Sequence, residues 1–72
     1  MNTRVIEIQS ILENDVLDIS LKIKEVQRIC GDDLIESRTD KEIKRMREGS
    51  ITSEKAAKSI DDDAEYWRGQ NG

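Results

Sequence analysis

The chain has 72 residues, enough for one small domain, and its content of 35% hydrophobic and 3% aromatic residues allows only a modest, mainly aliphatic core. The net charge of −4, from 16 acidic and 12 basic residues, argues against a broad nucleic-acid interface, which requires a cationic face. Histidine is absent and Cys30 is the single cysteine, which excludes zinc spacings, histidine-based catalytic triads and a disulfide framework.

The first predicted element is a long helix over about residues 3–30. Its apolar residues recur at steps of three and four, which on a helix places them in one stripe. The stripe consists of Val5, Ile8, Leu12, Val16, Ile19, Ile23, Val26 and Cys30. A β-hairpin with its turn at residues 13–15 competes, because Leu17 to Lys24 alternates between apolar and polar residues. We favour the helix, since the alternation fails at doublets such as Val5-Ile6.

A second helix is predicted over about residues 33–48, after Gly31, which is suited to end the first helix. Its apolar face is thin and consists of Ile35, Ile43 and Met46. The run from Thr39 to Glu42 fits a capping box, so the segment forms either one helix or two pieces separated near Thr39.

A third helix is predicted over about residues 53–68, after a turn at Gly49 and a cap at Thr52 or Ser53. Its apolar side consists of Ala56, Ala57, Ile60, Ala64 and Trp67. Residues 1–68 are therefore expected to form a single helical domain, and residues 69–72 a flexible tail.

The length of the first helix leads to a prediction about assembly. A helix of 28 residues is about 42 Å long, whereas a compact chain of this size has a radius of gyration of about 11 Å. Two shorter helices in a hairpin or three-helix arrangement cover only part of it. The N-terminal stripe of Val5, Ile8, Leu12 and Val16 would then be bare and recruit a second chain, giving a homodimer or larger oligomer with coiled-coil-like contacts.

Few residues suggest chemistry. Cys30 lies on the apolar stripe and is expected to be a buried, unreactive thiol. Consecutive acids at positions 61–63 diverge around a helix, so only the pairs Asp61/Glu65 or Asp62/Glu65 can converge, and the run is expected to form a solvated face and no metal site. The bases between Arg38 and Arg47 are interleaved with acids, which is typical of an exposed, ion-paired face. No catalytic residue, cofactor or metal is predicted.

The only aromatic residues, Tyr66 and Trp67, allow two interpretations. Trp67 shares a face with Ile60 and Ala64 and fills either this chain's core or a partner's surface, while Tyr66 is turned about 100° away. The sequence thus predicts an all-α, cytoplasmic, non-enzymatic protein that binds another protein as a regulator, inhibitor or adaptor, without membrane partners. The candidate partner-binding residues are Val5, Ile8, Leu12, Val16, Tyr66 and Trp67. One alternative is a coiled-coil-like oligomerisation module; another is a DNA-binding transcriptional regulator that uses residues 40–68.

Overall fold

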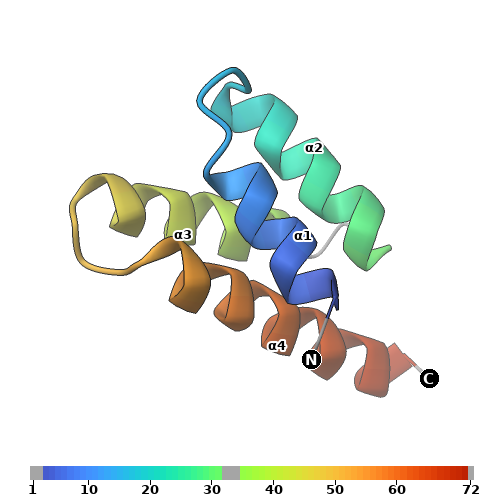
Figure 1. Ribbon diagram of the computed structural model, residues 1–72. Helices are drawn as coiled ribbons and strands as arrows, with labels where there is room; N and C mark the ends of the chain where they lie inside the picture. The colour runs from blue at the N-terminus through green and yellow to red at the C-terminus, as the bar shows by residue number, and fades with distance from the viewer. Residues whose placement is uncertain (1–2, 32–34, 72) are drawn as a thin grey trace.

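The computed structural model describes residues 3–31 and 35–71, and within these ranges all regular secondary structure is helical, as the sequence predicts (Figure 1). The helices are α1 (Thr3–Leu12), α2 (Ile19–Cys30), α3 (Glu36–Arg47) and α4 (Ser53–Asn71). The predicted start of the second helix at residue 33 lies outside the described residues.

The single helix predicted over residues 3–30 is wrong, because residues 13–18 separate α1 from α2. The side chain of Asn14 accepts a hydrogen bond from the Val16 N–H at 3.0 Å, which offers the backbone an alternative to the helical pattern. Asp18 then caps α2 by accepting from the Leu21 N–H at 2.9 Å. The ammonium group of Lys22 donates to the Leu12 carbonyl at 3.1 Å and so satisfies a free acceptor at the end of α1.

The competing β-hairpin is wrong as well, since both of its strands are helices in the structure. Its proposed turn at residues 13–15 is nevertheless where the chain reverses. The pair α1–α2 is therefore an antiparallel helical hairpin, and its connection at residues 13–18 includes, but is longer than, the turn of the β interpretation (Figure 1).

α3 is one continuous helix, and the capping box within it does not form. The Thr39 hydroxyl donates to the Ile35 carbonyl at 2.9 Å, a bond within the helix, and Glu42 faces inward. The helix ends as predicted at Gly49, whose φ of 78° is left-handed. The Ser50 N–H bonds the Arg45 carbonyl at 2.9 Å, and the Gly49 N–H bonds the Met46 carbonyl at 3.1 Å, which together make a Schellman motif.

α4 begins at Ser53, as predicted, with Thr52 as its cap. The Thr52 hydroxyl oxygen accepts from the Lys55 N–H at 3.2 Å. The helix continues to Asn71 and so reaches into the segment that the sequence predicted to be a tail.

The four helices enclose one small core. α1 packs against α2 and α4, and α3 packs against the same two helices. The radius of gyration is 11.2 Å and the extents are 34 × 22 × 20 Å, as expected for a compact chain of this length. The buried hydrophobic residues are Ile8, Leu12, Val26, Cys30, Ile35, Ile43, Ala56, Ala57, Ile60 and Ala64. Cys30 is thus buried, as its place on the stripe predicted. Among the described residues, no helix has the length and apolar content to cross a membrane.

Candidate protein-binding surface

The predicted partner-binding residues are distributed over three places in the structure. Ile8 and Leu12 belong to the core of this chain, so they do not form a bare stripe. Val16 is 91% exposed in the connection between α1 and α2, and Val5 is half-buried on α1. Only Tyr66 and Trp67 lie together, near the C-terminal end of α4.

The two aromatic rings form an edge-to-face pair. Their centroids are 5.5 Å apart and their planes are inclined at 80°. Tyr66 is 59% exposed, whereas Trp67 is half-buried, in keeping with its position one turn beyond Ala64 on the inner side of α4. Trp67 therefore contributes partly to this chain's fold and still presents a surface to solvent.

Two small hollows border the aromatic pair, and Asp63 lines both. The first, of about 230 Å³, lies between α3 and α4 and is lined by Ser37, Arg38, Lys41, Asp63 and Trp67. The second, of about 290 Å³, is lined by Arg38, Ser59, Asp62, Asp63 and Tyr66. We refer to Tyr66, Trp67, Arg38 and Lys41 with these hollows as the aromatic surface.

Arg38 is held in the aromatic surface by carboxylates on two helices. Its guanidinium lies 3.7 Å from the Glu42 carboxylate and 4.0 Å from that of Asp63. Glu42 is completely buried and also accepts from Arg45 at 3.1 Å. This arrangement is not predicted by the sequence, because Glu42 fits a capping box and the arginines are interleaved with acids in the manner of an exposed face. Arg38 is thereby fixed beside the rings.

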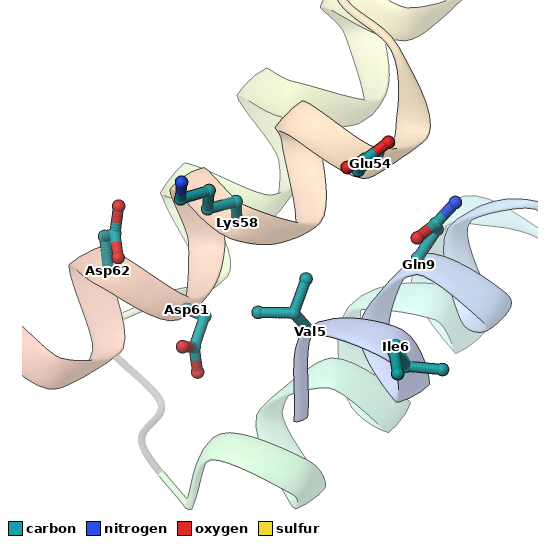
Figure 2. Close-up of a pocket in the computed structure, with 7 residues that line it drawn as sticks. All are labelled: Val5, Ile6, Gln9, Glu54, Lys58, Asp61 and Asp62. Carbon is teal, nitrogen blue, oxygen red and sulfur yellow. The ribbon is translucent and has the colours of Figure 1, made fainter. Parts of the chain in front are cut away.

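A larger groove of about 400 Å³ runs between α1 and α4 (Figure 2). In Figure 2, Val5 points into the space between the two helices. Ile6, which also lines the groove, is 48% exposed. The remaining lining residues are Gln9, Glu54, Lys58, Asp61 and Asp62. The sequence analysis did not select Ile6, although the doublet Val5-Ile6 signals that one of the two residues must lie off the buried stripe.

The acidic run of α4 is only partly the solvated face that the sequence predicted. Asp61 is 2% exposed because it lies on the same side of α4 as Ala57 and Ala64. Arg4 of α1 forms an ion pair with Asp61, in which Nε lies 3.1 Å from the carboxylate. It also donates a hydrogen bond to the Glu65 carboxylate at 2.8 Å. Carboxylate oxygens of Asp61, Asp62 and Glu65 lie within 4.8 Å of one another. With an arginine already bound to two of them, this cluster is an ion-pair network that joins α1 to α4.

No protein-family model, no curated protein and no solved structure matches this chain. The observations that bear on function are therefore the aromatic surface and the groove between α1 and α4.

Proposed function

We propose that this chain is a small, non-enzymatic, cytoplasmic protein that regulates or links another protein by binding it through the aromatic surface. The observation that carries the proposal is the exposure of Tyr66, at 59%, directly beside the half-buried Trp67, with each of the two side chains lining one hollow. The absence of histidine and of any recognised catalytic motif supports binding over catalysis.

The composition of the aromatic surface is that of a binding hot spot. Tryptophan, tyrosine and arginine are the residues whose truncation costs most in protein interfaces, and this surface has one of each. The hollows beside the rings offer space for side chains of a partner.

Two side chains of this surface have contacts within the chain that restrict them before a partner binds. Trp67 is half-buried, and the Arg38 guanidinium lies 3.7 Å from the Glu42 carboxylate and 4.0 Å from that of Asp63. Side chains that are already ordered lose less conformational entropy when a partner binds, and this saving amounts to about 0.5–1.5 kcal/mol per side chain.

The two alternatives from the sequence gain no support from these surfaces. A coiled-coil module needs an exposed stripe, and Ile8 and Leu12 are buried. A DNA-reading helix within residues 40–68 would be α4, whose exposed residues include the acids Glu54, Asp62 and Glu65. These carboxylates would approach phosphates at a cost in binding free energy.

The proposal is tested by capture from an extract of the source organism with the immobilised chain. A partner retained by the unchanged chain should be lost with Tyr66→Ala, because removal of a hot-spot residue costs about 2 kcal/mol or more. Val16→Ala is the matched control, since it truncates another exposed side chain far from the rings along the chain. Circular dichroism should show that both variants remain folded.

Fluorescence of Trp67, the only tryptophan, gives a second measurement on the purified pair. Binding at the aromatic surface should cover its exposed edge and shift the emission to shorter wavelength. Equal capture by Tyr66→Ala and Val16→Ala, with unchanged emission, would contradict the proposed function.

A further inference from the structure

The groove between α1 and α4 is a second surface with the anatomy of an interface. Val5 and the half-exposed Ile6 supply an apolar part, and Gln9, Glu54 and Lys58 supply a polar rim (Figure 2). Of the residues that line this groove, Asp62 alone also lines a hollow of the aromatic surface.

The rim contributed by α4 has a regular pattern of charge. Glu54, Lys58 and Asp62 are exposed and follow one another at steps of four residues, so they stand about one helical turn apart. Within the described part of the chain, none of these three residues has an ion-pair partner. Their charges are available to a partner in the order negative, positive, negative.

The end of the groove at Asp62 carries an excess of negative charge. Asp61, Asp62 and Glu65 place oxygens within 4.8 Å of one another, and Arg4 binds Asp61 and Glu65. Lys58 of the same rim lies one turn before Asp62, so the charged residues that line the groove are three acids, Glu54, Asp61 and Asp62, and one lysine. A lysine or arginine side chain from outside would find complementary charge beside the apolar part of the groove.

We propose that this groove binds a basic amphipathic helix of another protein. An aliphatic side chain of that helix packs on Val5 and Ile6, and its lysines or arginines face Asp62 and Glu54. A helix suits the site because a groove between two packed helices accepts the ridge of a third, and because the rim charges repeat at the helical step.

A second copy of this chain fits the groove less well than a basic helix, because of its charge. Each copy has a net charge of −4, so two copies repel. The basic residues of α3 that it would offer are already paired in part, Arg38 and Arg45 with Glu42 and Lys44 with Asp40.

The test uses two labelled model peptides, both helical, each with a leucine stripe. One carries lysines beside the stripe and the other carries glutamates at the same positions. Fluorescence anisotropy should show binding of the lysine peptide and at least about tenfold weaker binding of the glutamate peptide, a difference of about 1.4 kcal/mol.

Ile6→Ser should weaken binding of the lysine peptide about tenfold or more, since it removes apolar contact area within the groove and leaves its charge unchanged. Leu21→Ser is the matched control, because Leu21 of α2 is 45% exposed, close to the value for Ile6, and does not line the groove. Ile6→Ala replaces Ile6→Ser if circular dichroism shows that the latter is unfolded.

A charge exchange makes the test specific. The double variant Glu54→Lys with Asp62→Lys should reverse the preference towards the glutamate peptide. Tyr66→Ala should leave peptide binding unchanged, which separates this groove from the aromatic surface. The proposal is overturned if neither peptide binds, if both bind equally, or if Ile6→Ser leaves the affinity for the lysine peptide unchanged. It is also overturned if light scattering shows a dimer that Ile6→Ser dissociates.

Discussion

At the residue scale, the positions that the sequence identified most reliably are those set by backbone geometry. Gly31 and Gly49 both have positive φ at the end of a helix, and Thr52 caps the next one. These features depend on a few neighbouring residues, which a sequence displays directly. Arg4 and Asp61 form a contact although they are 57 positions apart in the sequence, and no local pattern indicates it.

Gly49 and Gly69 should respond in opposite directions to the same substitution. Gly49→Ala forces a side chain into a left-handed conformation, with φ of 78°, and should lower the free energy of unfolding by about 1 kcal/mol. Gly69→Ala adds a methyl group within α4, where it would meet no atom within 4 Å apart from the adjacent backbone of its own helix, and should raise the free energy of unfolding by up to about 1 kcal/mol. Urea unfolding monitored by circular dichroism measures both. Destabilisation by Gly69→Ala would contradict the helix assigned to that position.

At the element scale, the principal error of the sequence analysis was the continuity of the first helix. The apolar stripe is consistent with α1 and α2 taken separately, because Ile8, Leu12, Val26 and Cys30 are all buried. Periodicity alone does not show that the helix is interrupted between Leu12 and Val26. The interruption comes from side-chain hydrogen bonds of Asn14 and Asp18, residues that favour turns and caps. Val16, which appeared to belong to the stripe, is in the connection and contacts mainly solvent.

Because the helix is interrupted after Leu12, the same substitution should affect stability differently at Leu12 and at Val16, two positions that would be equivalent on a single long helix. Leu12→Asp places a carboxylate at a site that is 3% exposed and should unfold the chain, since the cost of a buried unpaired charge rivals the total stability of about 5–15 kcal/mol. Val16→Asp should change the free energy of unfolding by about 0.5 kcal/mol or less. Far-UV circular dichroism distinguishes them. Retained helicity in Leu12→Asp would favour the uninterrupted helix.

At the scale of the whole molecule, the break between α1 and α2 alters the expectation about assembly. The homo-oligomer predicted from the sequence followed from a helix too long for the globule. With the chain reversed at residues 13–18, all four helices fit within 34 Å and Ile8 and Leu12 are covered by the chain itself. The oligomer stays a prediction from the sequence. The reason for it was an overlong helix with a bare apolar stripe, and this fold has no such helix within the described residues.

The distribution of the remaining exposed apolar residues leads to the converse prediction for the isolated chain. The large hydrophobic residues that are exposed in the described part of the chain, Ile6, Val16, Leu21 and Tyr66, are divided among α1, the connection, α2 and α4, with no more than one on each. Together with the net charge of −4, this scatter should keep the purified chain at the mass of one copy in light scattering at moderate concentration. A stable dimer would contradict this expectation, and the variant that dissociates it would locate the contact. Dissociation by Tyr66→Ala would assign the aromatic surface to self-association, whereas dissociation by Ile6→Ser would assign the groove between α1 and α4.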